Sequence, residues 1–515
     1  MKWDRRKFLR GAPLVAASLA GCARTHPLGM NGARDVTGPK ANAYKYRIAF
    51  GAWINDMRND PLPLENWPAP QLDDETIDSA IRAMDVQSAA GFKLLDVWGL
   101  FATYAWPPDI TSALDHDRRR KINTLIKAAK DRGMQLSLGL GTYSWGYDKI
   151  IETDPGVRGR DAAGNPHPHA LCDANPKSFE YVRRIIDFAL SEFDFGAVHV
   201  ESCDLGCCFC RECAGKDGVV GYNVRINQKT ADYIKSKWPG KTVYVITINW
   251  VPPLKHLSEK EMEQVLTLGK HIDCLFDQGH CGYHVPESER GSFIRKLGCD
   301  YGTSGGLWLY PDVRWDRACY FVPYVKRTAA ALKKLYDDGG RGCMFYQGPV
   351  SNPSTEANIA VGGRMLSDIS RNPEDVLAQV IELYYKPRDA AAHRKLVEIF
   401  VRAEEGYFSQ WKEELFKKVW GIFVPGEFKL DQRLFGTSPG PATLFVEPCL
   451  DAEGRLAYKK ALVSILRDLP GLRGRFADNG RLDNIRRCLI ITLNLINTIA
   501  YVKGESQVLS GESKQ

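Results

Sequence analysis

Residues 178–202, SFEYVRRIIDFALSEFDFGAVHVES, contain the pattern that decides the fold. In the first part, residues 178–192, apolar side chains recur at helical spacing among polar ones, which predicts an amphipathic helix. In the second part, residues 195–202, an apolar run begins beside Gly196 and predicts a buried strand. A glycine at this place is typical of a helix that ends and a parallel strand that begins. The stretch therefore predicts one helix–strand unit of an α/β protein.

The same unit recurs along the chain, with Gly91 and Gly133 in the place of Gly196. The strand-like runs are residues 46–54, 92–100, 134–141, 195–202, 242–250, 272–279, 299–310 and 341–350. Amphipathic stretches lie between these runs, so strands and helices alternate. This alternation predicts a (β/α)₈ barrel of the TIM type over residues 45–362. A doubly wound open sheet is the alternative, because alternation alone does not show that the sheet closes.

Helical patterns dominate the sequence after residue 362. They occur at residues 375–385, 391–417, 456–469 and 482–502, and a connector rich in Gly and Pro lies at residues 421–454. No repeat of about 20–50 residues is visible, which argues against a solenoid. We therefore predict an all-helical C-terminal domain over residues 363–515.

The composition is that of an ordinary globular protein, since 44% of the 515 residues are hydrophobic and 25% are charged. Lys and Arg outnumber Asp and Glu by 69 to 62, and more than half of this excess lies in the first ten residues. Nucleic-acid binding needs clustered Lys and Arg that neutralise phosphates. The charge distribution therefore argues against a nucleic-acid partner.

The first 22 residues resemble an export signal. Arg5 and Arg6 precede a short apolar stretch, as in a twin-arginine signal, and LAGC at residues 19–22 is similar to the lipobox of a bacterial lipoprotein. The resemblance implies that Cys22 is lipidated and that residues 23–44 form a tether. We expect an exported protein, anchored by lipid to a bacterial cell membrane on its periplasmic or cell-surface side. The sequence leaves the oligomeric state open.

Functional residues of such barrels lie at the carboxyl ends of the strands. At the predicted strand ends the sequence is rich in aromatic, carboxylate and amide side chains. Tryptophan rings stack on the C–H faces of sugars while polar side chains bind sugar hydroxyls, so this composition favours a carbohydrate substrate. The candidate substrate-binding residues are Trp53, Asp96, Trp98, Tyr143, Trp145, His199, Asn249, Trp250, Trp308 and Gln347.

Hydrolysis of a glycosidic bond normally needs two carboxyl groups, one protonated and one ionised. Glu201 follows the apolar run of residues 197–200 and is the candidate general acid. Asp277, at the end of the sixth predicted strand, is the candidate base. The competing partners are Asp204, Asp96 and Glu356. Of these, Asp204 lies so close to Glu201 that it would fit a mechanism that uses the substrate's own group.

Several motifs resemble the catalytic barrels of α-glucuronidase-like and β-N-acetylhexosaminidase-like glycoside hydrolases. They are AAKDRG at residues 128–133, GNP at 164–166, NP at 175–176 and VESCD at 200–204. The stretch of residues 372–387 is similar to the domain that follows such barrels. The resemblance implies a general acid on the fourth strand, matched by Glu201. In the inverting α-glucuronidases it also implies an Asp base on the sixth strand, matched by Asp277.

A cysteine-rich segment follows Glu201 directly. The spacing Cys207-x-x-Cys210-x-x-Cys213, with Cys203 as a fourth ligand, is compatible with tetrahedral thiolate coordination and a structural zinc. Disulfides are the alternative in an exported protein, and buried free thiols are the third possibility. The motifs that bind nucleotide phosphates are not found, so we expect no organic cofactor.

These observations predict a glycoside hydrolase that acts on an oligo- or polysaccharide through paired carboxylates. The alternative is a non-catalytic carbohydrate-binding surface lipoprotein. Such a protein would keep the tryptophan-rich mouth of the barrel and use Glu201 only for hydrogen bonds.

Overall fold

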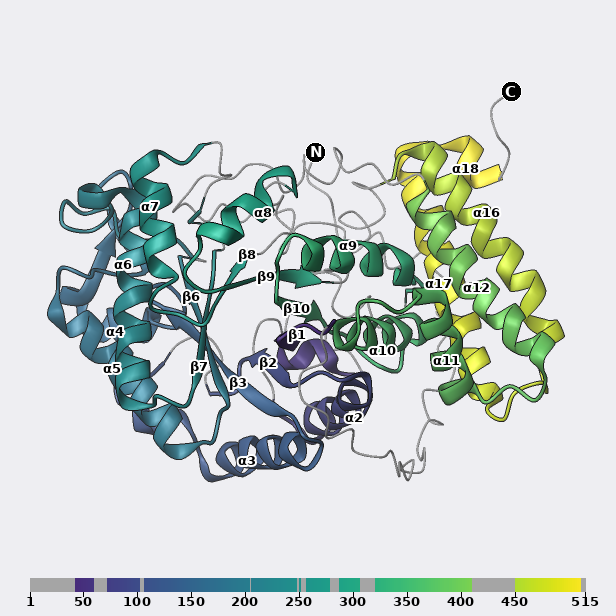
Figure 1. The fold of residues 1–515 in the computed structure, drawn as a ribbon, viewed down its shortest axis with the longest axis horizontal. Helices are drawn as coiled ribbons and strands as arrows, with labels where there is room; N and C mark the ends of the chain where they lie inside the picture. The colour runs from purple at the N-terminus through teal and green to yellow at the C-terminus, as the bar shows by residue number, and fades with distance from the viewer. Residues whose placement is uncertain are drawn as a thin grey trace, which may run out of the picture. The chain divides into compact units, whose positions relative to one another are not determined.

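The computed structural model describes residues 42–59, 72–101, 106–203, 205–247, 250–251, 256–277, 287–305, 320–409 and 450–510. Eight parallel strands in these residues close into a barrel (Figure 1). Around the barrel they follow the order β1 (Tyr46–Trp53), β10 (Gly342–Tyr346), β9 (Asp300–Gly305), β8 (Cys274–Asp277), β7 (Thr242–Ile246), β6 (Ala197–Ser202), β3 (Gln135–Thr142) and β2 (Leu94–Trp98). The closed sheet confirms the predicted (β/α)₈ barrel and excludes the open sheet.

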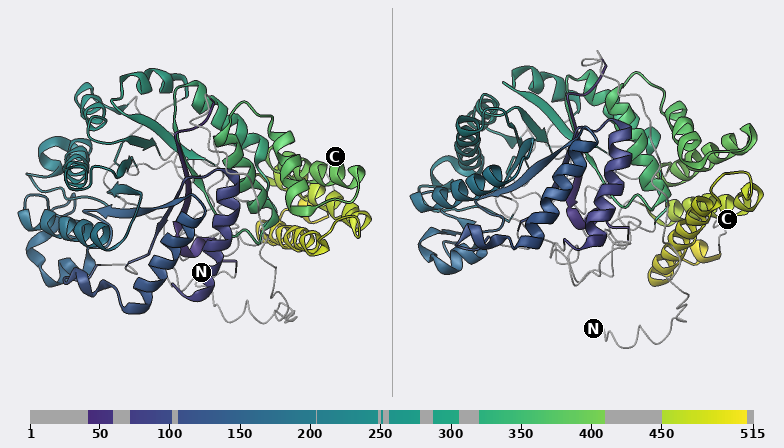
Figure 2. Two further views of the ribbon diagram at one scale, coloured as in Figure 1. Left: turned by 60° about the horizontal axis from the view of Figure 1, so that its bottom comes forward. Right: turned by 90° about the horizontal axis from the view of Figure 1, so that it is seen from below.

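Helices cover the outside of the barrel, as the ribbon views show (Figure 1, Figure 2). In chain order they are α2 (Asp74–Ala90), α3 (His116–Asp131), α5 (Pro176–Glu192), α6 (Ala214–Lys237), α7 (Glu259–Leu268), α8 (Glu287–Lys296), α9 (Val325–Asp337) and α10 (Pro353–Ser367). One of them follows each barrel strand, which is the right-handed strand–helix–strand unit that the sequence pattern predicts.

Asn-Pro dipeptides begin three helices, α5, α10 and α11 (Pro373–Tyr385). The side chains of Asn175, Asn352 and Asn372 each accept a hydrogen bond from a backbone N–H of the first helical turn. The proline that follows has a fixed φ that suits this position and lacks only an N–H that has no partner within the helix. Two of these dipeptides belong to the motifs behind the family resemblance, and here they cap helices.

A short antiparallel sheet of β4 (Arg158–Arg160) and β5 (Pro166–Leu171) lies between β3 and α5. The sequence analysis predicts no strand in this connection. The backbone N–H of Leu171 donates to the carbonyl of Tyr143 at 2.8 Å, which joins the hairpin to the carboxyl end of β3. The loop after β3 therefore has a structure of its own beside the barrel mouth.

Alternate residues of each strand face the barrel interior and the helix layer. On β6, Ala197 belongs to the interior core, whereas Val198 and Val200 belong to the core between strands and helices. Among the described residues, large side chains from several strands pack together in the interior and form a core. They include Phe50, Tyr244, Phe276, Met344 and Tyr346.

The C-terminal region is helical, as predicted. Its elements are α11, α12 (Ala390–Phe408), α16 (Ala452–Asp468), α17 (Asn479–Lys503) and α18 (Ser506–Ser510). The predicted boundary at residues 362 and 363 falls inside α10, and residues 40–515 form one compact unit. The Tyr458 hydroxyl donates to the carbonyl of Phe321 at 2.7 Å, and the N–H of Phe321 donates to Thr492 at 3.0 Å. Buried hydrogen bonds thus join the helical region to the barrel.

Helix α17 is long and apolar enough to cross a membrane by length and composition alone. Its buried residues recur at helical spacing from Leu482 to Ala500, and the helix contacts α16 and α18. Burial along one side is the pattern of a helix that packs in a protein core.

The predicted signal, with Cys22, and the tether up to residue 41 lie outside the described residues. The next residues are part of the folded unit. The carbonyl of Asn42 accepts a hydrogen bond from the N–H of Ile369 at 2.9 Å. Tyr44 is buried, and its hydroxyl donates to the carbonyl of Leu332 at 2.5 Å.

Candidate active site at the mouth of the barrel

Glu201 lies near the carboxyl end of β6. Strands β3 and β7 flank β6 and place Gly141 and Ile246 opposite Glu201. Glu201 and Ala197 lie on the same face of β6, the face toward the barrel interior. Glu201 is 7% exposed. The structure therefore places a carboxyl group just inside the mouth of the barrel, with little access to water.

His199 lies beneath Glu201 and joins it to Asp96 on β2. The Nε2 atom of His199 is 3.4 Å from Oε2 of Glu201, and the Nδ1 atom is 2.7 Å from Oδ2 of Asp96. His199 and Asp96 are completely buried. The structure places both residues inside the barrel, where they form a series of contacts that ends at Glu201. Their predicted contact with substrate stays a prediction.

Tyr244 and Ser137 extend this series to two further strands, and the sequence analysis missed both. The Tyr244 hydroxyl donates to Oδ2 of Asp96 at 2.7 Å and lies 2.7 Å from the hydroxyl of Ser137. Burial, and then the nearby Asp96 carboxylate, raise the pKa of Tyr244 well above its usual value. Tyr244 therefore remains a hydrogen-bond donor to Asp96. The position of Ser137 between Leu136 and Leu138 on β3 is the signal that could have found it.

Three of the predicted tryptophans gather at the carboxyl ends of β1, β2 and β3. The ring of Trp53 is 6.5 Å from that of Trp98 and 5.7 Å from that of Trp145, measured between centroids. Trp98 meets the His199 ring edge-on at 5.5 Å. Trp98 and Trp145 are half-buried, so part of each indole is accessible at the mouth. Two further predicted residues, Asn249 and Trp308, lie outside the described residues.

Glycines on β3 make room for these rings. A Cβ atom on Gly139 would lie 3.0 Å from the Trp98 ring, and one on Gly141 would lie 2.2 Å from Cβ of Trp145. No side chain fits at Gly141, because the chain turns back so that Trp145 covers the end of its own strand. The glycines in the run LGLG thus have a steric role in forming the tryptophan wall, defined as Trp53, Trp98 and Trp145.

Three other predicted substrate-binding residues are buried in the protein. Tyr143, Trp250 and Gln347 are each 2% exposed or less. The indole N–H of Trp250 donates to the carbonyl of Ile246 at 3.0 Å, and Gln347 accepts a hydrogen bond from the Gln87 amide at 3.0 Å. Among the described residues their polar groups contact other protein groups at the strand ends, and their predicted role toward substrate stays a prediction.

Asp277 ends β8, two strands from β6, and Asp204 lies outside the described residues. Phe276 is level with Glu201 in the strand register, so Asp277 is one residue further toward the mouth. However, Asp277 and Leu275 lie on the same face of β8, and Leu275 belongs to the core between strands and helices. The side chain of Asp277 therefore lies on the outward face of the strand. The Tyr301 hydroxyl donates to Oδ2 of Asp277 at 3.0 Å, and burial raises the pKa of Tyr301 well above its usual value. Asp277 therefore lies at the carboxyl end of the barrel but contacts Tyr301, which belongs to the core between strands and helices.

The structure gathers four cysteines that could hold a metal ion, and they differ from the predicted set. They are Cys172, Cys208, Cys210 and Cys213. Of the predicted ligands, Cys203 and Cys207 are not in this group. The hairpin of β4 and β5, which the sequence analysis did not predict, brings Cys172 to the loop that follows β6. A metal site at this loop remains compatible with the structure, but with two ligands exchanged.

The fold is similar to solved structures of glycoside hydrolases. A mutant of the O-GlcNAc hydrolase of Thermobaculum terrenum is 12% identical, with a TM-score of 0.50, over 91% of this chain and 88% of that one. A family 138 glycoside hydrolase that targets the pectin rhamnogalacturonan II is 12% identical, with a TM-score of 0.55. The match covers 92% of this chain and 59% of the length of that enzyme.

No protein-family model matches the sequence, and no curated protein sequence matches it. At 12% identity the likeness to the solved structures shows the fold alone. The protein is thus a (β/α)₈-barrel protein with a helical C-terminal region, of a fold that these glycoside hydrolases share. Its activity has to be argued from its own site.

Proposed function

We propose that the protein is a glycoside hydrolase with Glu201 as its general acid. The observation that carries the proposal is the position of Glu201 near the carboxyl end of β6, 3.4 Å from His199, whose ring in turn meets Trp98 of the tryptophan wall at 5.5 Å. A sugar ring stacked on the half-buried indoles would bring its glycosidic oxygen to the carboxyl end of β6. The glycoside hydrolase fold of the structural neighbours supports this assignment by analogy.

The surroundings of Glu201 suit the role of an acid. Nδ1 of His199 lies 2.7 Å from Asp96 and Nε2 lies 3.4 Å from Glu201, so His199 links the two carboxyl groups in the interior. Glu201 is 7% exposed, and carboxyl groups shielded from water are the ones that serve as general acids. A protonated carboxyl can give its proton to the leaving-group oxygen as the bond breaks.

Asp277 is the second carboxylate in this proposal, because it stands at the same end of the barrel as Glu201. We expect Asp277→Asn to lower kcat/KM by about 10²-fold or more if Asp277 activates water. Tyr301→Phe removes the hydrogen bond at 3.0 Å but keeps the carboxylate, so it should lower kcat/KM by less than about tenfold. Steady-state kinetics of the two variants, with thermal unfolding as a check on the fold, measure both effects.

Equal small losses in the two variants would instead make Asp277 a structural acceptor for Tyr301. Glu201 would then be the single carboxyl at the described part of the mouth. That outcome favours either a mechanism in which a group of the substrate takes part or the second candidate function, a carbohydrate-binding protein without catalysis. The observation that favours this second candidate is that Asp277 lies on the outward face of β8, together with Leu275.

A panel of aryl glycosides and oligosaccharides tests the proposed function, with uronides and N-acetylhexosaminides included. Product release by the purified protein is the expected result. Binding of a sugar without release of product from any substrate would support the binding protein and oppose the enzyme. Calorimetric titration on the same panel makes the two outcomes distinguishable.

We also infer from the N-terminal motifs that the protein is exported and attached to a membrane through lipid on Cys22. Replacement of Cys22 by Ala should move the protein from the membrane fraction to the soluble fraction. Retention of the Cys22→Ala variant in the membrane fraction would oppose lipid anchoring at this residue.

A further inference from the structure

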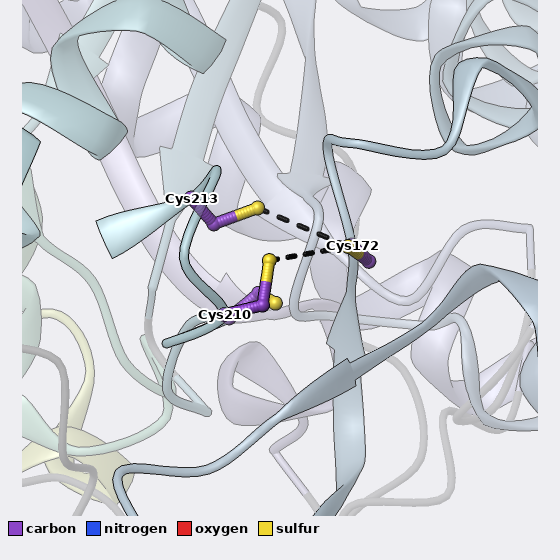
Figure 3. A group of neighbouring side chains, drawn as sticks. Cys172, Cys210 and Cys213 are labelled. Carbon is purple, nitrogen blue, oxygen red and sulfur yellow. Dashed lines mark hydrogen bonds between the residues drawn. The ribbon is translucent and has the colours of Figure 1, made fainter. Parts of the chain in front are cut away.

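The loops that follow β3 and β6 meet at four cysteines, three of which are labelled in Figure 3. Cys172 directly follows β5, and the other three lie between β6 and α6. The Sγ atom of Cys172 is 3.7 Å from that of Cys210 and 3.9 Å from that of Cys213 (Figure 3). All four sulfur atoms lie within 4.8 Å of one another.

These separations match a metal site and not a pair of disulfides. The sulfur atoms of a disulfide are about 2.05 Å apart. Zinc binds thiolates at about 2.3 Å, and the edges of such a tetrahedron place the sulfur atoms about 3.8 Å apart. We propose that Cys172, Cys208, Cys210 and Cys213 bind one zinc ion in a closed tetrathiolate site. Each thiol gives up its proton when the ion binds.

The backbone around the sulfur atoms is shaped for such a site. The backbone N–H of Arg160 donates to Sγ of Cys208 at 3.4 Å, a contact that stabilises a thiolate and orients it. The N–H groups of Cys213 and Gly215 both donate to the carbonyl of Cys210, at 3.0 and 3.1 Å, and form a tight turn between two ligands.

Two glycines allow the close approach of these segments. A Cβ atom on Gly215 would lie 2.8 Å from the carbonyl oxygen of Cys210. A Cβ atom on Gly159, in β4, would lie 3.1 Å from Cβ of Cys208. A side chain at either position would therefore press against a ligand-bearing segment, so the glycines are part of the site.

The site joins two strand ends that carry unusual backbone conformations. Among the non-glycine residues that the structure describes, three have a positive φ, and two of these are Tyr143 with 67° and Cys203 with 68°. They are the next residues after Thr142 and Ser202, which are partners in the register of β3 and β6. Left-handed backbone at such residues persists only where the surrounding structure holds it.

Zinc would hold both loops where they leave the barrel beside Glu201. Four protein thiolates fill a tetrahedral ion and leave no position for substrate or water, so the role of the ion is structural. Its expected effect on catalysis is indirect and rests on the proposed function of Glu201. Metal binding itself does not depend on that function and can be tested without any substrate.

Metal analysis of the purified full-length protein and of single variants tests the ligand set. We expect about one zinc per chain in the parent protein, and less than about a tenth of that in Cys172→Ser and Cys208→Ser. Cys203→Ser and Cys207→Ser are matched controls, because these buried thiols lie in the same segment but outside the group of four. Both controls should keep the metal.

Two outcomes would overturn the proposal. One is a parent protein without metal whose cysteines are oxidised to disulfides. The other is loss of metal from the Cys203 and Cys207 variants with retention in the Cys172 and Cys208 variants.

A measurement on the unmodified protein remains valid even if a variant fails to fold. Arg211 lies in the turn between Cys210 and Cys213, and 94% of its side chain is exposed, so trypsin can reach it. Removal of zinc by a chelator should speed cleavage after Arg211 by about tenfold or more, because the turn then opens more often. Added zinc should reverse the effect. Equal cleavage with and without chelator would contradict a role for zinc in holding this loop.

Discussion

Replacement of Glu201 by Gln is expected to lower kcat/KM by about 10²- to 10⁴-fold on substrates with poor leaving groups, the range typical of a lost general acid. Gln has nearly the same shape as Glu and can still accept a hydrogen bond, so the barrel should keep its fold. The variant loses only the transferable proton. Circular dichroism and thermal unfolding of the variant check that the structure is unchanged.

The leaving group distinguishes an acid from a base or nucleophile at this position. A dinitrophenolate departs without protonation, so dinitrophenyl glycosides should be cleaved by Glu201→Gln at close to the parental rate. Alkyl glycosides need the proton and should show the full loss. Equal losses on both kinds of substrate would contradict the acid role. Glu398→Gln, an exposed change on α12, is the matched control and should alter neither rate.

The barrel could be predicted from the sequence because each of its strands is an apolar run between amphipathic helices. The strand ends were less predictable for a physical reason. In a parallel sheet covered by helices both faces of a strand are apolar, so the alternation along β8 does not tell which face Leu275 and Asp277 share. For β6, too, the sequence does not tell which residues face the interior, and only the structure places His199 and Glu201 on the inner face.

The cysteine ligands show a second limit. Spacing rules favoured Cys207, because Cys207-x-x-Cys210 is a common pattern of zinc ligands. The loop instead directs the adjacent Cys208 to the group, and the fourth ligand, Cys172, comes from a hairpin 36 positions earlier in the sequence than Cys208. A sequence pattern records spacing within one loop, but not which second loop folds against it.

The buried series beneath Glu201 was partly visible in the sequence. Asp96 and His199 stood out as polar residues in apolar strands, and the sequence analysis assigned them to substrate. The structure shows that polar residues on different strands can contact one another inside a barrel, since Oδ2 of Asp96 lies 2.7 Å from both Nδ1 of His199 and the Tyr244 hydroxyl. Contacts between strands depend on the stagger of the barrel, which a single strand does not encode.

Replacement of Asp96 by Asn is expected to lower the free energy of unfolding by about 1–3 kcal/mol, because it replaces the buried carboxyl acceptor of the Tyr244 hydroxyl by an amide and leaves a buried polar group without a suitable partner. Oδ2 of Asp96 lies 2.7 Å from both Nδ1 of His199 and the hydroxyl of Tyr244, and all three residues are completely buried. No water can replace a lost partner at this depth. Denaturant unfolding, followed by the fluorescence of the nearby tryptophan wall, measures the change.

The exposed pair of Lys127 and Asp131 provides the matched control. Its atoms are 2.5 Å apart, but the side chains are 76% and 54% exposed, so Asp131→Asn should change the free energy of unfolding by less than about 1 kcal/mol. A loss below about 1 kcal/mol for Asp96→Asn would mean that the contacts of Asp96 with Tyr244 and His199 contribute little to stability. The buried series of Asp96, His199 and Glu201 would then not be what holds the Glu201 side chain in its place, and the position of Glu201 would depend on the packing of the strands alone.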